Sequence, residues 1–328
     1  ITSLIVLLCS CNEVATGPAV PGSTGTTYEL IVACPDKAWD GPIGDTLRNF
    51  FGQLDETMFM REELYNLVHI DKETLENNKM FSFSKSILIV DVVAGVEPKA
   101  ETKKNMWAKP QRVYRFTVPD SESFIELFGK YQNQMLESYY DIEREKLNAY
   151  YKTALNRSVI ESVGKKFGYT FNITTGFRIA KNYSDFMWLR SETDKTSTNI
   201  LIYEEDYTDE NQLQQGYILL KRDLMTKQHV PASMEGSYAK VSEVFPVVSE
   251  VTNINGLYAV ETRGAWDCEN DFMGGTFLNY TIVDTERNKI LTIDAFIYIP
   301  SKEKRVFMMQ LEAMIHSLYP WTNPKEQD

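Results

Sequence analysis

Short apolar runs and one segment with helical spacing organise the first third of the chain. Runs of strand length occupy residues 28–33, 64–70, 87–93 and 112–118. Residues 42–54 place large apolar side chains three or four positions apart, which is typical of an amphipathic helix. The pattern therefore predicts four strands and a helix in this part of the chain.

The longest helical pattern begins at Asp120 or Ser121, either of which is a natural helix cap. Its apolar stripe continues for about six turns, and a second helical piece ends near Gly164 or Gly168. Upstream of this helix, residues 95–105 carry Pro and alternating charges and predict an exposed loop.

The second half of the chain is richer in strands. Residues 177–179, 186–190 and 200–203 are short strand candidates, and a helix is predicted at 210–225. A final amphipathic helix is predicted over residues 300–318. It begins at Pro300 and is followed by Pro320, which ends it.

Two hairpins join the remaining strands. Asn255-Gly256 is the strongest short hairpin signal, because a type I′ turn needs positive φ at both central positions. It connects residues 247–254 to 257–262, and a charged turn connects 277–283 to 290–299. The last of these strands has a clean period of two, which predicts one buried face.

A strand, then Pro and a polar residue, then an amphipathic helix occurs at residues 113–135 and again at 293–318. This repetition predicts an α+β fold of two similar units, each an antiparallel sheet with its helices packed on one face. The units are predicted at residues 28–168 and 169–320, followed by a polar tail at 321–328. A single sheet that continues through both halves is the alternative.

Composition limits the class of protein. The 328 residues are 43% hydrophobic, which is enough for a packed core of one large or two modest domains. With 34 basic and 46 acidic side chains the formal net charge is −12. We therefore expect no nucleic-acid partner, since such proteins present a basic face to phosphates.

The N-terminus is typical of an export signal. Residues 1–8 are largely apolar and too few to span a bilayer as a helix. Leu8-Cys9-Ser10-Cys11 resembles the bacterial lipobox, although Cys9 stands where a small residue such as Ala or Ser is more usual. The resemblance implies that residues 1–10 are a signal-peptide remnant and that Cys11 carries the lipid. The alternative is a chance apolar terminus with two buried thiols.

Residues 11–27 are rich in Gly, Pro, Thr and Ala, and they predict a lipidated tether. Several acyl chains hold a protein stably at a membrane. The expected partner of this segment is therefore the membrane, reached through the lipid anchor. The expected location is the bacterial envelope, at its outer membrane.

Cys34 and Cys268 are the thiols of the folded part. The periplasm is oxidising, so they would pair if the fold brought them together. Two separate small buried residues is the simpler interpretation.

No sequence motif of a known catalytic class is present. The three histidines, His69, His229 and His316, are far apart, and the chain has no HExxH, GxSxG or glycine-rich phosphate motif. We therefore expect no cofactor, and a non-catalytic protein is favoured over an enzyme. A nucleophile and base that meet only in the folded chain remain an open alternative.

Asp267, Glu269 and Asp271 alternate ahead of Gly274 and Gly275, a spacing loosely like that of a calcium loop. The glycine comes late and no glutamate follows in register, so a polar loop is the simpler interpretation. The sequence predicts no metal site.

Two tryptophans are candidates for a binding surface. Trp107 follows the charged loop, and Trp266 lies between Arg263 and the segment Asp271 to Gly275. Trp combines a large contact area with a polar edge, which suits binding surfaces. We take Trp107, Arg263, Trp266, Asp271, Gly274 and Gly275 as candidate binding residues. Core or hairpin packing is the competing interpretation.

Over most of the folded body the chain resembles a family of uncharacterised Bacteroidetes lipoproteins, known as a domain of unknown function. The resemblance rests on six segments: Ile87-Leu-Ile-Val-Asp91, Met106-Trp-Ala-Lys-Pro-Gln111, Trp188-Leu-Arg190, Glu235-Gly-Ser-Tyr238, Tyr258-Ala-Val-Glu-Thr-Arg-Gly264 and Asp271-Phe-Met-Gly-Gly275. It implies an exported lipoprotein and supplies no catalytic residues. The element order of the second half is also similar to small extrinsic proteins of photosystems, which work as binding subunits.

These observations favour an envelope lipoprotein whose body binds or assembles with an envelope protein or a glycan. The alternative is an envelope hydrolase or ligand-carrying enzyme with a site near Trp266 and Asp271–Gly275.

Overall fold

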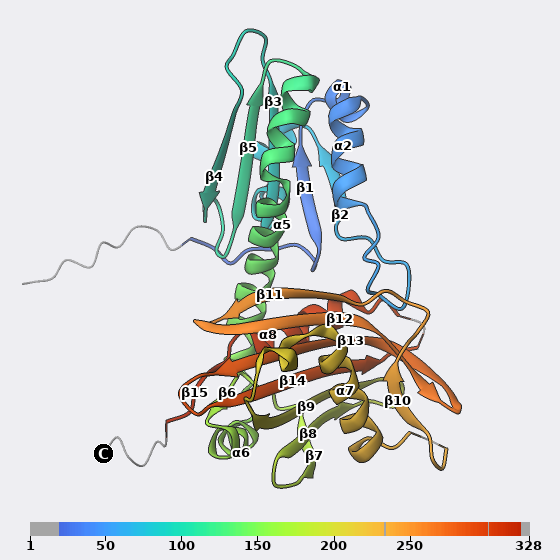
Figure 1. Ribbon diagram of the computed structural model, residues 1–328. Coiled ribbons are helices and arrows are strands. Elements are labelled where there is room, and N and C mark those ends of the chain that lie inside the picture. The colour runs from blue at the N-terminus through green and yellow to red at the C-terminus, as the bar shows by residue number, and fades with distance from the viewer. Residues whose placement is uncertain (1–19, 233, 301, 323–328) are drawn as a thin grey trace, which may run out of the picture.

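The computed structural model describes residues 20–232, 234–300 and 302–322. Cys11 and residues 1–10 lie outside these ranges, so lipidation and export stay predictions. Figure 1 shows a smaller sheet standing on one side of a larger, curled sheet. One long helix lies along the smaller sheet and continues to the larger one. Helices and strands are mixed in both parts, and the predicted α+β class is confirmed.

The first unit is built on a five-stranded sheet of order β2-β1-β3-β5-β4. Its strands are β1 (Glu29–Ala33), β2 (Asn66–Ile70), β3 (Ser86–Val92), β4 (Lys99–Lys104) and β5 (Arg112–Val118). Its helices are α1 (Asp36–Trp39), α2 (Pro42–Phe51), α3 (Lys72–Asn77), α4 (Lys79–Ser82) and α5 (Ser121–Tyr151).

This sheet differs from the expected antiparallel arrangement, because β2, β1, β3 and β5 all run parallel. Parallel strands are normally buried on both faces. Leu88 and Val90 pack on the face covered by α2 and α5, whereas Ile87 and Ile89 pack toward α3 and α4. Helices therefore cover both faces of this sheet. The continuous apolar run of β3 is the sequence signal for that burial.

Residues 99–104 form strand β4 rather than part of an exposed loop. The strand lies at the sheet edge, antiparallel to β5, and most of its side chains are exposed. Edge strands often carry charges that prevent pairing with other chains. The alternating charges that predicted a loop are therefore those of an edge strand.

Helix α5 connects the two units. Asp120 caps it as predicted, accepting a hydrogen bond from the backbone N–H of Ser123 at 2.9 Å. Its first half packs on the five-stranded sheet through Phe124 and Phe128. Its last turns reach the second unit, where the Asn148 side chain donates to the backbone oxygen of Ala313 at 2.7 Å.

The second unit contains an eight-stranded sheet in which all neighbouring strands are antiparallel. The strands are β7 (Arg178–Asn182), β8 (Phe186–Glu192), β9 (Ser197–Asp206), β10 (Tyr238–Val241), β11 (Val248–Ile254), β12 (Leu257–Glu269), β13 (Asp271–Asp284) and β14 (Lys289–Tyr298). A small sheet pairs β6 (Tyr169–Thr170) with β15 (Tyr319–Pro320). The helices are α6 (Arg157–Phe167), the 3-10 turn η1 (Glu210–Leu213), α7 (Gln215–His229) and α8 (Arg305–Ile315).

Both predicted hairpins are present. Asn255 and Gly256 have φ of 50° and 95° and join β11 to β12. The charged turn joins β13 to β14. The described strands of the two units form separate sheets, so the alternative of one sheet continuing through both halves does not hold for residues 20–232, 234–300 and 302–322.

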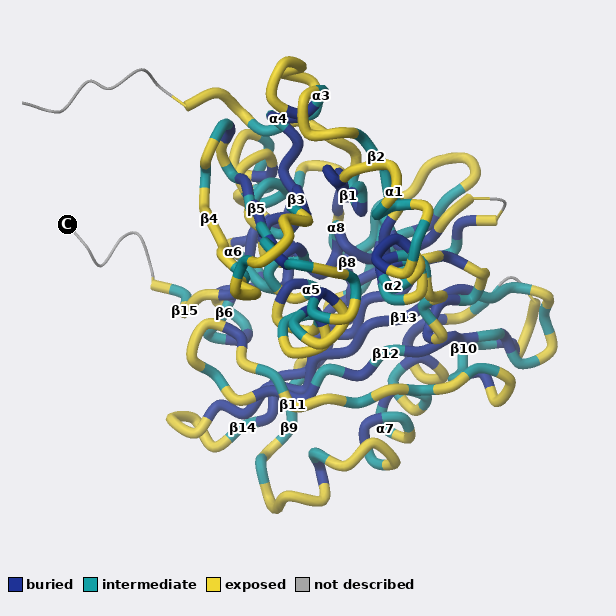
Figure 2. Tube along the Cα trace, turned by 90° about the horizontal axis from the view of Figure 1, so that it is seen from above, coloured by how far each residue is buried: buried dark blue, intermediate teal, exposed yellow. Residues whose placement is uncertain are grey.

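The two faces of the eight-stranded sheet are covered by different helices. Residues of α6 and α8 pack with Leu278, Ile293 and Ile297 in the larger core, whereas α7 packs over Phe277 and Phe296 on the opposite face. Figure 2 shows the central strands as the buried part of the molecule. The predicted unit boundary at residue 168 falls after α6, so this helix is assigned by its packing to the second core.

The end of the predicted tether lies against the first unit. The backbone N–H of Ser23 donates to Lys109, and that of Thr24 donates to Phe83, at 3.1 and 2.8 Å. Cys34 and Cys268 are free, buried thiols in different hydrophobic clusters, as the simpler interpretation predicted. Within the described ranges, the helices are too short or too polar to span a bilayer.

Candidate functional site

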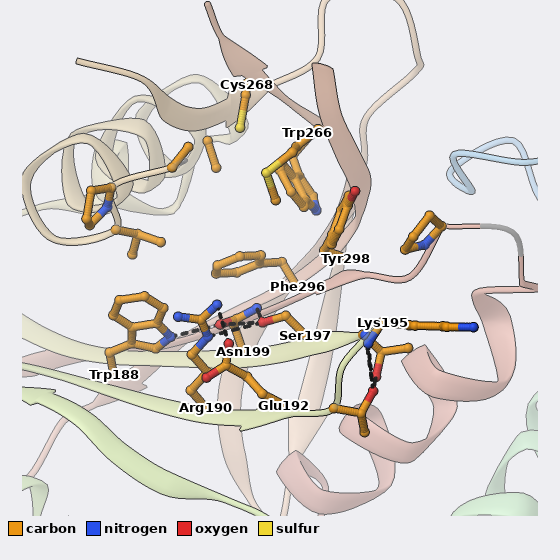
Figure 3. A pocket seen from close by; sticks show the side chains of 18 of the residues that line it. Trp188, Arg190, Glu192, Lys195, Ser197, Asn199, Trp266, Cys268, Phe296 and Tyr298 are labelled. Carbon is orange, nitrogen blue, oxygen red and sulfur yellow. Dashed lines mark hydrogen bonds and ion pairs between the residues drawn. The ribbon is translucent and has the colours of Figure 1, made fainter. Parts of the chain in front are cut away.

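A cleft of about 950 Å³ opens on the α7 face of the eight-stranded sheet, beyond the C-terminal end of that helix. We call it the sheet cleft. Its floor is formed by Trp188, Asn199, Trp266, Cys268 and Phe296, and its rim includes Arg190, Glu192, Lys195, Tyr298 and Lys302. Figure 3 shows that labelled side chains of β8, β9, β12 and β14 surround one space, whereas Lys195 lies in the loop between β8 and β9. The volume is in the range of ligand-binding pockets.

Trp266 is an almost fully buried residue of the floor. Its side chain is only 2% exposed, and its indole N–H donates to the backbone oxygen of Ile297 at 3.2 Å. The ring of Phe296 meets the indole edge-on with centroids 5.6 Å apart. The indole of Trp266 is therefore packed in the core, as the competing interpretation predicted. The hydrophobic cluster that contains it also borders the sheet cleft.

Gly275 makes room for this indole, and Gly274 makes room for the ring of Phe59. A Cβ atom on Gly275 would lie 2.0 Å from the Ile297 oxygen and 2.9 Å from the Trp266 indole nitrogen. A Cβ atom on Gly274 would lie 2.8 Å from the ring of Phe59. The two glycines thus serve close packing on both faces of β13.

A chain of hydrogen bonds fixes the polar side of the sheet cleft. The Trp188 indole N–H donates to Asn199 Oδ1 at 3.0 Å, and Asn199 Nδ2 donates to Ser197 Oγ at 3.1 Å. Arg190 donates to the same hydroxyl at 3.2 Å and pairs with Glu192 at 2.6 Å. The Arg190 guanidinium also lies 5.2 Å from the centre of the Trp188 ring.

Cys268 and Ser197 are described cleft residues that carry a thiol or hydroxyl near these groups, and neither is placed as an activated nucleophile. Burial, with the nearby carboxylates of Asp271 and Asp267, raises the pKa of the Cys268 thiol to about 11, so the thiol is protonated at neutral pH. Ser197 has Arg190 and Asn199 as partners instead of a base. No histidine is found among the described residues that line the cleft.

The histidines have other roles. The ring of His69 stacks on Trp39 at 4.7 Å, and that of His229 on Phe186 at 4.1 Å. His316 caps the C-terminus of α8, and its Nε2 lies 3.0 Å from the hydroxyl of Tyr280. In the described part of the chain, no three His, Cys, Asp or Glu side chains are grouped to hold a metal ion.

The structure separates the predicted binding residues. Trp107 is half-buried in the first unit, against the cluster that contains Ile31 and Ile87, and so lies away from Trp266. Arg263 points to the opposite face of β12 from Trp266. Asp271 begins β13, where its Oδ1 accepts from the backbone N–H of Phe272 at 2.7 Å.

Arg263 lines a second cleft of about 580 Å³ between the two units, which we call the junction cleft. Its walls come from the loop before β2, from α5, from β11 and β12, and from α8. They carry seven carboxylates and three guanidinium groups: Asp55, Glu63, Glu137, Asp141, Glu250, Glu261 and Glu312, with Arg144, Arg263 and Arg305.

Glu312 is the centre of a buried ionic network at this cleft. Its carboxylate is 2% exposed and pairs with Arg144 at 2.5 Å and with Arg263 at 2.6 Å. Arg263 also pairs with Glu261, which accepts a hydrogen bond of 2.6 Å from the Tyr280 hydroxyl. Burial opposes ionisation of Glu312, but the charges of Arg263 and Arg144 prevail and lower its pKa.

Sequence reasoning missed most of these polar residues. Asn199 is buried in β9, Asp294 is buried in β14, and Glu312 is buried in α8. Isolated polar residues on a buried face are the signal that could have found them, because burial forces each to have a partner.

Two family models match consecutive parts of the chain. Residues 156–317 match a domain of unknown function, DUF4837. Residues 23–152 match a second domain of unknown function, DUF8532. The two matches meet between α5 and α6, where the packing also changes from one core to the other. The predicted resemblance to a domain of unknown function is supported to this extent.

No curated protein matched the sequence. Among solved structures, the Ran-binding protein Mog1p of Saccharomyces cerevisiae is similar, at 9% identity over 47% of this chain and 90% of that chain, with a TM-score of 0.32. A Mog1 mutant gives the same values. A likeness this remote carries no functional argument.

Proposed function

We propose that the chain is an exported lipoprotein of the bacterial envelope, anchored at Cys11, whose body is a non-catalytic module that binds an envelope protein in the sheet cleft. The anchor rests on the lipobox-like segment and the signal-like run before it. The binding role rests on the cleft itself: a preformed hollow with an apolar floor and a polar rim.

The floor favours a protein ligand over a glycan. Sugar rings stack on open aromatic faces, whereas Trp266 is almost fully enclosed and Arg190 covers the Trp188 ring. What the floor offers is an apolar depression suited to a side chain of a partner protein. The rim carries Arg190, Lys195 and Lys302 beside Glu192 and Asp194, so it can pair with charges of either sign.

The hydrolase alternative is less well supported. The Cys268 thiol is protonated and has only the carboxylates of Asp271 and Asp267 nearby, which raise its pKa. Among the described residues, the Ser197 hydroxyl is hydrogen-bonded to Arg190 and Asn199 rather than to a histidine base. Hydrolysis by a side-chain nucleophile needs such a base or a lowered pKa.

Crosslinking in cells tests the binding role. A photoreactive amino acid is placed at Thr196 on the cleft rim of the full-length lipoprotein, and the same residue at Tyr150, an exposed position on α5, is the control. Specific capture at Thr196, lost when Ala239→Trp fills the floor, supports the proposal. Equal capture at both positions, or capture unchanged by Ala239→Trp in a normally folded variant, contradicts it.

The lipid anchor has its own test. In Cys11→Ala we expect the protein to move from the membrane fraction to the soluble fraction. A variant that stays membrane-bound would contradict anchoring at this cysteine.

A further inference from the structure

The junction cleft follows the open edge of a strand. In the described part of the chain β11 pairs with β12 and with no other strand. The consecutive residues Glu250, Val251, Thr252 and Asn253 all line the cleft. Consecutive strand residues point to opposite faces, so a cleft that touches all of them runs along the edge of the strand. Figure 1 shows β11 on the side of the sheet that faces the first unit.

This edge has little protection against pairing. In an antiparallel pair, alternate residues of an edge strand direct their backbone N–H and C=O groups away from the neighbouring strand. Val251 is 67% exposed and Val248 is 40% exposed, so apolar side chains flank those groups. Lys, Pro and bulges are the usual protective devices. Within β11 the one charged side chain is Glu250.

A helix forms the opposite wall. Glu137, Tyr140, Asp141 and Arg144 are spaced three, four and seven residues apart on α5, so they form one face toward the cleft. The Tyr140 hydroxyl has no hydrogen bond to another described residue, while its ring packs against Tyr28 and Tyr65. The wall thus presents carboxylates and a hydroxyl to whatever occupies the space.

The charge of the cleft selects the occupant. Seven carboxylates face three guanidinium groups. Arg144 and Arg263 are engaged by Glu312, Asp141 and Glu261. Asp55, Glu63 and Glu250 have no ion-pair partner among the residues described, and no lysine lines the cleft. Extended backbone with basic side chains would satisfy both the open edge and the excess negative charge.

We propose that the junction cleft binds an extended, basic segment of a partner protein, which adds to the open edge of β11 as a further strand. Main-chain hydrogen bonds to β11 hold the segment, and Lys or Arg side chains pair with Glu250, Asp55 and Glu63. The seven residues of β11 span about 23 Å, which sets the length of the segment at roughly seven residues. This site is independent of the sheet cleft, and its failure would leave the proposed function standing.

The test uses an end-blocked, fluorescent octapeptide of alternating lysine and valine, titrated into the full chain. Two comparison peptides separate charge from strand addition. One replaces lysine by glutamate, and the other keeps lysine but is N-methylated at alternate residues, which removes the N–H groups of one edge. We expect the first to lose detectable binding and the second to bind at least about tenfold more weakly than the parent peptide.

Protein variants locate the site. Glu250→Lys should weaken binding of the parent peptide by about tenfold or more. Glu145→Lys makes the same charge change at an exposed position of α5 outside the cleft, and should change binding less than about twofold. Hydrogen exchange should slow in the amides of β11 when the parent peptide is bound.

Three results would overturn the proposal. They are the absence of binding at millimolar parent peptide, equal binding of the parent and N-methylated peptides, and equal weakening by Glu250→Lys and Glu145→Lys. The second would indicate a simple cation site. The third would indicate attraction to the net negative charge of the whole chain.

Discussion

The two clefts lie on opposite faces of one sheet and differ in both chemistry and origin. Along β12, Trp266 and Cys268 face the sheet cleft, whereas Glu261 and Arg263 face the junction cleft. The sheet cleft is built entirely from the second unit, and the junction cleft needs α5 and the loop before β2 from the first. Side chains that alternate along β12 thus contribute to two clefts on opposite faces of the sheet. Of these, only the junction cleft depends on how the two units pack together.

Buried charge is also handled differently on the two faces. Glu312 has two arginine partners on the junction side. On the α7 side, Asp294 accepts from Arg222 Nε and Asn279 at 3.1 and 3.0 Å, while its Oδ1 and both Arg222 Nη atoms are buried without a hydrogen-bond partner in the described structure. The junction network is thus the more completely paired of the two, and substitutions there should have larger effects.

The largest effect is expected for Glu312→Gln. The substitution removes the buried carboxylate that Arg144 and Arg263 share, and leaves Asp141 and Glu261 as their remaining close ion-pair partners. Removing one partner of a buried ion pair costs about 3–5 kcal/mol. We expect a loss of that size in the free energy of unfolding, measured by urea denaturation at pH 7. Glu126→Gln, which removes an exposed pair with Lys130 on the same helix as Arg144, is the control. Equal midpoints for wild type and Glu312→Gln would contradict the role assigned to this network.

Gly275→Ala should perturb the sheet cleft. The added methyl group meets the Ile297 oxygen and the Trp266 indole, and overpacking of this kind costs about 1–3 kcal/mol. The sheet cleft should be distorted, so capture through Thr196 should fall while peptide binding at the junction cleft persists.

Alanine substitution of a second glycine, Gly129, should raise the stability of the chain instead of lowering it. Gly129 lies inside α5 with open space where a Cβ would be placed. Gly129→Ala should therefore stabilise the chain by about 0.5–1 kcal/mol, since glycine is unfavourable in a helix interior. Similar loss of stability in both alanine variants would show that crowding at Gly275 is not the cause.

How much of this was predictable depends on whether the information is local. The cap of α5, its apolar stripe and the hairpin at Asn255-Gly256 depend on residues that are close in the sequence, and the structure confirms each of these predictions. The parallel pairing of β1 and β3 depends on residues far apart in the chain, and an apolar run such as Ile87 to Val90 fits either direction. The edge strand β4 resembles a loop because its charges are exposed in both cases.

The candidate site shows the same limit. The sequence predicts a binding surface around Trp266, and this residue does border a cleft. It also predicts that Trp107 belongs to a binding surface, but Trp107 packs in another hydrophobic cluster. Arg263 was selected with them and belongs to the opposite face of the sheet. Which side chains share a cleft is decided by strand order, and no spacing in the sequence encodes the contact between β12 and β14 across β13.

The two buried carboxyls should titrate in opposite directions. Glu312 is held below its ordinary pKa of 4.5 by Arg263 and Arg144, despite its burial. Its contribution to stability is complete above the unfolded value and is lost as the pH falls through the lower folded value. Burial raises the pKa of Asp294 above 3.8, so its protonation favours the folded state as the pH falls. Carbon NMR of the two carboxyl groups measures both, and shifts of equal sign would contradict the contrast between the faces.

The smallest effect is expected at the thiol of the sheet cleft, and it bears on whether the cleft is catalytic. With a pKa of about 11, roughly one Cys268 thiol in ten thousand is ionised at pH 7, so alkylation by iodoacetamide should be slow and should rise with pH. Cys34, whose pKa burial raises to about 12, is the internal comparison, and the urea-unfolded chain shows that both can react. Rapid modification of native Cys268 at pH 7, with Cys34 unmodified, would mean an activated thiol and would favour the hydrolase over the binding module.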